Sequence, residues 1–331
     1  IERGELMNIE IIVQDSKSGI AYDISELITN VVWETTLTNQ PGKLTFNYID
    51  DTKVTISEGS PISFKVDGKG VFFGYIFKRG KKKDEKIPVT AYDQMRYLKN
   101  KDTYVLSGLT ASQIFTKICN DFRLSSEVID SSSYIVSPRV HDNKTLFEII
   151  QHAIDETLIN TGNWYMIRDN FGKLQFISIN SMKTDIFIGD ESLLIDFDYE
   201  SSIDNDTYNQ VKLIKENKET KKREIYVVKD SGTIKQWGLL QYFEKMDENA
   251  NPAQIKARAD MLLKLKNRVT KKLKLECLGD LKVFAGTGVV LGISDLEKEG
   301  IPINQYFMVT RCSHTFKNDL HTMQLEVQVS I

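Results

Sequence analysis

The sequence contains little of what marks a secreted, membrane-spanning or disordered protein. Its 331 residues include only 3 cysteines, 6 prolines and 19 glycines. An odd and sparse set of cysteines argues against a disulfide framework and favours a reducing place of synthesis, so we expect Cys119, Cys277 and Cys312 to be small core residues. No apolar run approaches the ~18 residues of a membrane span, and neither a low-complexity tract nor a secretory signal is visible. We therefore expect an ordered, water-soluble chain without a membrane anchor.

An excess of charge of one sign is also missing. The 43 Lys and Arg residues nearly balance the 46 Asp and Glu residues, and the formal net charge is −3. A protein that binds nucleic acid by bulk electrostatics carries a clear positive excess, so we expect neither that activity nor sequence-specific binding of nucleic acid. The length, at ~150 residues per domain, predicts two or three domains.

Residues 1–100 predict a β-module. Apolar and polar residues alternate in Leu44–Tyr48 and in Ile62–Val66, which is typical of antiparallel strands with one buried face. Asp67-Gly68 favours a type I′ turn into the next strand, Val71–Phe77. Such a sheet must close or pack to hide its edges, so we expect a small antiparallel barrel or sandwich.

Residues 101–192 predict an inserted α/β domain. The segments Thr110–Gln113 and Thr145–Glu148 each have the pattern of a capping box ahead of an amphipathic helix. The second helix is expected to stop at Gly162, because glycine readily adopts the left-handed conformation that ends helices. Asn170-Phe171-Gly172 then predicts a short hairpin.

Residues 193–331 predict a second β-module that resembles the first. Strands expected at residues 273–277, 286–291, 306–310 and 323–329 correspond in order and spacing to those at residues 44–48, 59–64, 74–78 and 86–92. A long helix, with Asn251 as N-cap and Pro252 at its first position, is expected near residues 252–268 of this module. The predicted fold class is mainly β with α+β character: two similar small antiparallel barrel or sandwich modules, an inserted α/β domain and one long helix.

Two groups of titratable residues could hold a metal. Four side chains of the second helix could share one face: Glu148, His152, Asp155 and Glu156. Because they form the polar side of an amphipathic helix and lack the spacing of a zinc protease, we interpret them as a solvated face with local ion pairs. A thiolate and two imidazoles could bind zinc near the C-terminal end: Cys312, His314 and His321. A structural zinc site normally takes four ligands, so we interpret these three as cross-strand packing and leave the metal open.

Three further patterns allow both a functional and an ordinary structural interpretation. The run Lys78–Lys83 could bind an anion, but we interpret it as a solvated hairpin tip. The basic side of the long helix is likewise interpreted as solvated: Lys256, Arg258, Lys264, Lys266 and Arg268. Tyr242 and Phe243 could stack on a sugar, although packing at a domain junction is the favoured interpretation. No nucleophile elbow, phosphate-binding loop or dinucleotide-binding loop is present, so we expect no enzyme, no catalytic, cofactor-binding or metal residue, and no cofactor.

From about Tyr104 onward, the order of motifs resembles the XkdQ/YqbQ family of phage tail proteins. This family comprises baseplate hubs of contractile tails and their relatives in PBSX-like prophages, and it is similar to the late control protein D group. The resemblance is carried by these segments: Asp142–Ile150, Ile167–Leu174, Tyr208–Lys212, Ile234–Gln241, Ala253–Ala259, Leu278–Asp280, Ser313–Phe316 and His321–Leu325. Residues 1–100 fit the family by length and strand pattern rather than by motif.

The resemblance implies a structural role. We expect a homotrimeric hub around a central channel, which joins a sixfold tail tube to a threefold spike and also contacts tape-measure or other baseplate proteins. It would lie in the virion tail baseplate after assembly in the bacterial host cytoplasm. The repeated module agrees with this, because three copies of a chain with two similar modules present six similar surfaces. Infectious phage, defective prophage and tailocin all stay open as sources, and the alternative functions are a peptidoglycan hydrolase and a carbohydrate-binding tail module.

Overall fold

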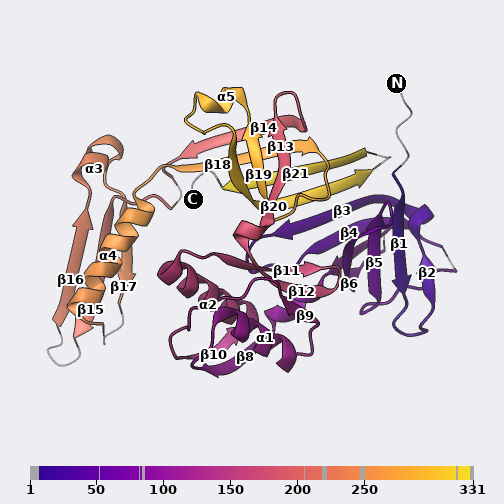
Figure 1. Cartoon of the computed structure of the whole chain (residues 1–331), viewed down its shortest axis with the longest axis horizontal. Coiled ribbons are helices and arrows are strands. Elements are labelled where there is room, and N and C mark those ends of the chain that lie inside the picture. Colours follow the sequence, from indigo (N-terminus) through magenta and orange to yellow (C-terminus); the bar gives the residue numbers. More distant parts are fainter. Residues whose placement is uncertain are drawn as a thin grey trace. The chain divides into compact units, whose positions relative to one another are not determined.

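The computed structural model describes residues 7–51, 53–81, 83, 86–204, 206–217, 222–246, 250–317 and 320–328 (Figure 1). The chain forms two compact units, one built from residues up to 198 together with those from 274 onward, and a second built from residues 199–273. The first unit is dominated by one large, mostly antiparallel sheet, so the predicted mainly β class is confirmed.

The N-terminal part of the large sheet is the first β-module. Its strands are β1 (Ile9–Gln14), β2 (Ala21–Asp23), β3 (Ile28–Thr36), β4 (Lys43–Ile49), β5 (Pro61–Val66), β6 (Lys69–Arg79) and β7 (Lys86–Tyr92), with the short 3₁₀ helix η1 (Ser25–Leu27) before β3. They lie side by side in the order β3-β4-β7-β6-β5-β1-β2. Alternate apolar residues of β4, β5 and β7 are buried in one core. The expected type I′ turn between β5 and β6 is confirmed, because Asp67 and Gly68 both have positive φ, at 49° and 74°.

The C-terminal part of the same sheet is the second β-module. Its strands are β13 (Lys183–Gly189), β14 (Leu194–Ser202), β18 (Thr270–Leu278), β19 (Gly288–Gly292), β20 (Gln305–Lys317) and β21 (Leu320–Gln328), with the short helix α5 (Ser294–Glu297) after β19. Their order is β14-β18-β21-β20-β19-β13, which repeats β3-β4-β7-β6-β5-β1 position by position. The predicted duplication is thus confirmed in topology, with one difference: β1 runs antiparallel to β5, whereas β13 runs parallel to β19.

An α/β layer lies between the two modules in sequence. It contains η2 (Gln94–Lys99), β8 (Lys101–Leu106), α1 (Ala111–Asp121), β9 (Ser126–Val128), β10 (Arg139–Thr145), α2 (Leu146–Thr161), β11 (Tyr165–Asn170), β12 (Lys173–Ser178) and η3 (Ile179–Met182). Both predicted capping boxes are present, at the N-termini of α1 and α2, and Gly162 ends α2 in the left-handed conformation. Helices α1 and α2 share a core with β11 and β12, and Cys119 is buried in it as expected.

The second unit has its own core. It contains β15 (Gln210–Asn217), β16 (Lys222–Lys229), α3 (Ser231–Trp237), β17 (Gln241–Lys245) and α4 (Pro252–Lys266), and its sheet order is β16-β15-β17. Apolar residues of α4 pack on one face of this sheet: Ile255, Ala259 and Leu262 against Val211 and Leu213. The sequence placed this segment inside the second β-module, but the structure separates it because these apolar faces bury each other. The expected helix is confirmed with Asn251 as N-cap and Pro252 in its first turn, although it ends at Lys266; α3 was not predicted.

The expected domain boundaries at residues 100 and 192 stay predictions. The compact units defined by contacts group the first module, the α/β layer and the second module together. Part of the charged stretch at residues 215–223 lies outside the described residues.

Candidate functional site: the seam between the β-modules

The two β-modules are joined by direct strand pairing. Strand β3 runs antiparallel to the second half of β20, from Thr36 opposite Arg311 to Val31 opposite Phe316. The first half of β20 pairs with β19 instead, and β21 occupies the other edge of β20 along most of its length. A single continuous sheet therefore crosses from one module into the other along β20; we call this β3–β20 junction the seam.

A β-bulge marks the point where β20 changes partner. The register between β20 and β21 shifts between Val309 and Arg311, and the amide of Leu37 donates to the carbonyl of Thr310 at 2.9 Å. A bulge adds one residue to a strand and re-aims it. Because β20 is 13 residues long and carries this bulge, its first half can pair with β19 and its second half with β3.

Ion pairs cover the polar face of the seam. Arg311 on β20 contacts Glu34 on β3 at 3.1 Å, and Glu34 also pairs with Lys43 on β4. Burial by itself would raise the pKa of Glu34, but hydrogen bonds and attraction from Lys43 and Arg311 hold it below the usual value. The Glu34 side chain is only 18% exposed, so this pair is better shielded from solvent than an ordinary surface ion pair.

The core face of the seam holds the candidate metal residues. The Nδ1 atom of His314 lies 2.8 Å from Nε2 of His321, and its Nε2 atom lies 2.7 Å from the carbonyl oxygen of Val283. A carbonyl only accepts, so Nε2 of His314 donates to it, and Nδ1 then accepts from His321. The Sγ atom of Cys312 is 3.1 Å from Nε2 of His314, and the ring of Trp33 from β3 stacks on that imidazole at 5.0 Å.

Burial keeps both imidazoles neutral. It lowers the pKa of His314 to about 3, with a further contribution from His321, and it lowers the pKa of His321 to about 4. Both nitrogens of His314 are engaged by protein groups, which matches the packing interpretation. Among the described residues, no group of three or more His, Cys, Asp or Glu side chains has the arrangement of a metal site.

Two carboxylates, the buried Asp93 and the half-buried Asp169, line the same cavity as Trp33 and His321. Asp93 accepts from the amides of Gly42 and Met95, and Asp169 accepts from the amides of Gly172 and Gln94. Burial, followed by repulsion from Asp169, raises the pKa of Asp93 well above its usual value, and burial raises the pKa of Asp169 to about 6. Through these hydrogen bonds, Asp93 connects the turn at Gly42 to η2, and Asp169 connects the turn at Gly172 to η2.

The four titratable residues of α2 do not converge on one point. Glu148 closes the capping box with Thr145. His152 contacts Arg139, Asp155 accepts from Gln151 at 2.7 Å, and Glu156 accepts from Ser137. Each side chain therefore has its own local partner. Of the ion pairs expected on a solvated face, the structure shows Glu148 with Lys144 at 3.4 Å, whereas His152 and Glu156 are half-buried.

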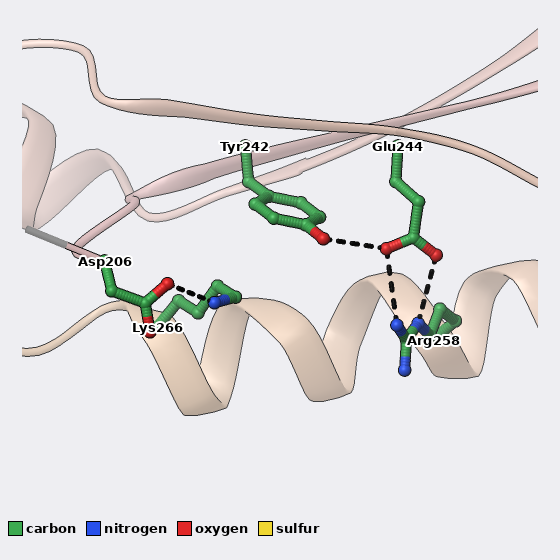
Figure 2. Close-up of polar contacts among 5 residues, drawn as sticks. All are labelled: Asp206, Tyr242, Glu244, Arg258 and Lys266. Carbon is green, nitrogen blue, oxygen red and sulfur yellow. Dashed lines mark hydrogen bonds and ion pairs between the residues drawn. The ribbon is translucent and has the colours of Figure 1, made fainter. Parts of the chain in front are cut away.

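Two residues on the basic side of α4, Arg258 and Lys266, contact acidic residues of the same unit (Figure 2). Lys256, Lys264 and Arg268 are exposed, as expected. Arg258 turns to the sheet instead and donates to both carboxylate oxygens of Glu244 on β17 at 3.3 Å, while the hydroxyl of Tyr242 donates to the same carboxylate at 2.9 Å.

The end of α4 is held by a second such contact. Lys266 pairs with Asp206, and its ammonium lies 5.8 Å from the ring centre of Tyr208 and 5.2 Å from that of Tyr242. Only 15% of the Lys266 side chain is exposed. The interpretation of the whole basic side as solvated was therefore wrong for Lys266, which contacts Asp206 and two tyrosine rings. Arg258 pairs with Glu244, but 41% of its side chain stays exposed.

Tyr242 itself packs inside this unit, with its ring 5.4 Å from that of Tyr208, whereas Phe243 on the opposite face is 54% exposed. The two candidate sugar-stacking rings thus face different ways. In the basic run that begins at the end of β6, Lys81 pairs with Asp50 at 3.3 Å, and Lys82 lies outside the described residues.

The residues that build the seam were not singled out from the sequence: Trp33, Glu34 and Arg311. The sequence held one signal for Trp33 and Glu34: the last residues of β3 resemble the last residues of β14. No helix of the described ranges is both long and apolar enough to cross a membrane.

Comparison with known proteins gives a consistent result. A family model described as YQBQ-like matches residues 31–328. The phage-like element PBSX protein XkdQ of Bacillus subtilis (strain 168) is 32% identical over 284 residues, which is 84% of each chain. The 43 kDa tail protein of prophage MuSo2 from Shewanella oneidensis has a similar structure, with a TM-score of 0.69 and 13% identity over 96% of this chain and 98% of that one.

A similar fold also occurs outside phages. The c3393 protein of E. coli is described as a component of the type VI secretion system with structural similarity to the T4 tail proteins gp27 and gp5. Its TM-score is 0.55 at 10% identity, over 98% of this chain and 75% of that chain. At such low identity the likeness concerns the fold alone.

Proposed function

Because the chain belongs to the YQBQ-like family, and is similar to phage tail and baseplate proteins, we propose that it is the structural hub of a contractile-tail baseplate. In this role it has no catalytic turnover. Three copies form a ring that adapts a sixfold tail tube to a threefold spike, in a phage, a prophage particle or a tailocin.

The observation that carries the proposal is the repeated strand order. Six strands of the first module, in the order β3-β4-β7-β6-β5-β1, recur as β14-β18-β21-β20-β19-β13. A closed homo-oligomer uses the same surfaces in every copy, so a chain with two similar modules offers two similar surfaces per copy. A trimer then presents six of them to a sixfold tube while it keeps threefold symmetry for the spike.

The partners are proposed from the family likeness, and the repeated module agrees with them. They are two further copies of this chain, a spike protein on one side, and the tail tube with tape-measure or other baseplate proteins on the other. The proposed location is the baseplate of a tail that assembles in the cytoplasm of the bacterial host.

Light scattering on the purified chain tests the proposal. We expect a mass of three times 37.9 kDa, either for the chain alone or after addition of its spike. A chain that stays monomeric at all concentrations and associates with no tail component would overturn the hub role.

A further inference from the structure

We propose that the seam inside the chain is repeated between copies, where β14 of one copy pairs with the second half of β6 in the next copy. This rests on the proposed trimeric hub and names the strands and residues that would close it. It follows from three sets of equivalent residues in the two modules.

The first set shows that β6 corresponds to β20. The amide of Gly59 donates to the carbonyl of Ile76 at 2.7 Å, and the amide of Gly286 donates to the carbonyl of Val309 at the same distance. Both glycines have positive φ, 83° and 96°. Directly after Ile76 and directly after Val309, a register shift follows against the next strand, β7 or β21. Ile76 therefore corresponds to Val309, and Lys78 corresponds to Arg311.

The second set lies next to this bulge. The guanidinium of Arg79 donates to the carbonyl of Ile56, and Sγ of the equivalent Cys312 lies 3.6 Å from the carbonyl of Val283. Ile56 and Val283 are both buried, at equal distances before the two glycines. The loops and strands that surround the free side of β6 thus repeat those that surround the seam side of β20.

The third set relates β3 to β14. Both strands have nine residues, and both lie outside the strand that follows them in the shared order, β4 or β18. Their last four residues match in type: Trp33-Glu34-Thr35-Thr36 and Tyr199-Glu200-Ser201-Ser202. Glu34 is the residue that pairs with Arg311 across the seam. Its equivalent in β14 is Glu200, which is exposed.

Both edges needed for the second seam are open. Within the described ranges, β14 is the last strand of the sheet on its side, and β6 beyond Ile76 has a strand neighbour only in β7. Open strand edges invite pairing with another chain unless they are blocked. One copy therefore carries both a strand to donate and an edge to receive one.

The charges of the two edges are complementary. The end of β6 carries Lys78 and Arg79 and is followed by Lys81 and Lys83, and β14 carries three acidic residues at every second position: Asp196, Asp198 and Glu200. Transfer of the β3–β20 register places Lys78 opposite Ser202 and brings it to Glu200 as Arg311 reaches Glu34. The basic run thus gains an acidic protein partner, a second copy of this chain.

The contact is head-to-tail, because different surfaces of each copy meet. Such contacts form a ring when the rotation between successive modules closes and a filament when it does not. Within each copy, β3 of the first module pairs with β20 of the second module. In the proposed contact, β14 of the second module pairs in the same way with β6 of the first module in the next copy. Three copies give six such steps around a ring.

Cysteine cross-linking tests the strand assignment directly. Residues directly opposite in an antiparallel pair have Cα atoms about 4.5–5.5 Å apart, within reach of a disulfide. Under mild oxidation, the variant with both Lys78→Cys and Ser202→Cys is expected to give covalent dimers and trimers on a denaturing gel. The matched control, Lys78→Cys with Asp198→Cys, moves the second thiol four residues along β14 and should remain monomeric. The native cysteines are all buried and free.

Charge reversal supplies the second test, by light scattering of the full-length chain. Lys78→Glu and Glu200→Lys should each weaken trimer formation at least tenfold, and the chain that carries both changes should recover it, because the pair is then reversed at every interface. Lys264→Glu, on the exposed side of α4, is the control and should have no effect.

A wild-type trimer that neither cross-links in the stated register nor responds to these reversals overturns the seam and leaves the hub intact. A wild-type chain that never trimerises, alone or with its spike, overturns both.

Discussion

The buried His314 and the half-buried His321 make acid destabilise this protein. Burial holds the pKa of these imidazoles at about 3 and about 4, against 6.5 for a free histidine. Between those values and 6.5, the unfolded chain binds protons that the folded chain does not. The stability is therefore fully present above pH about 6.5 and is lost progressively as the pH falls toward the folded values.

The magnitude follows from the linkage slope of 1.36 kcal/mol per proton and pH unit. Between pH 7 and pH 5, each histidine that stays neutral in the folded state lowers the free energy of unfolding by about 1.9 kcal/mol, so the pair lowers it by about 4 kcal/mol. Asp93 and Asp169 act in the opposite direction, because their raised pKa values mean that the folded state binds the extra protons in part of this range. The contribution of the histidines is therefore measured as a difference between variants.

The variant His321→Gln isolates the contribution of His321 to the pH dependence of the free energy of unfolding. An amide can still donate to Nδ1 of His314, as Nε2 of His321 does at 2.8 Å, but it does not titrate. Guanidinium unfolding at pH 7 and pH 5 should show the variant losing about 1.9 kcal/mol less than the wild type. Because the chain has only 4 histidines, their ring-proton NMR signals can each be assigned and titrated. Equal losses in both proteins, or a His321 signal that titrates near pH 6.5, would refute the reasoning.

Three other substitutions test packing at defined places. Phe316→Ala should lower the free energy of unfolding by about 3–5 kcal/mol in thermal or chemical melts, because this β20 side chain is 1% exposed and packs in the core of the first module; a loss below 1 kcal/mol would contradict that packing. In the same melts, Gly286→Ala should lower the free energy of unfolding clearly more than Gly19→Ala. Both glycines have positive φ, but a Cβ at Gly286 would lie 2.1 Å from Sδ of Met166, whereas a Cβ at Gly19 would meet open space. Lys266→Met should destabilise residues 199–273 by about 1 kcal/mol in hydrogen exchange of the α4 amides, since the ion pair and ring contacts are lost; Lys264→Met is the exposed control, and equal effects of the two would refute the contact.

Local elements could be predicted because their causes are local. The capping boxes at Thr110 and Thr145, the left-handed Gly162 and the Asp67-Gly68 turn all depend on residues within a few positions of one another, and the structure contains each of them. The module repeat was also visible, since strand spacing and alternation repeat along the chain. These signals were sufficient for the fold class, whereas the family was indicated by the order of motifs from about Tyr104 onward.

The candidate sites were harder, because they depend on residues far apart in sequence. Arg258 and Lys266 belong to a basic helix by sequence, yet in the structure Arg258 pairs with Glu244, and Lys266, which is 15% exposed, pairs with Asp206. His314 and His321 were grouped from the sequence, but only the folded structure shows that burial lowers the pKa of both and that the carbonyl of Val283 engages Nε2 of His314.

By itself, the sequence determined the starts of three helices, several turns and strands, and that two β-modules occur, since periodicity, caps and turns act over a few residues. Only the tertiary structure decided that β3 pairs with β20, that residues 199–273 form a separate core, and which ionisable groups are desolvated. These features arise from contacts between segments up to about 280 positions apart, such as Glu34 with Arg311. Pairing of this kind has no local signature, because any exposed strand edge offers the same backbone groups to any other.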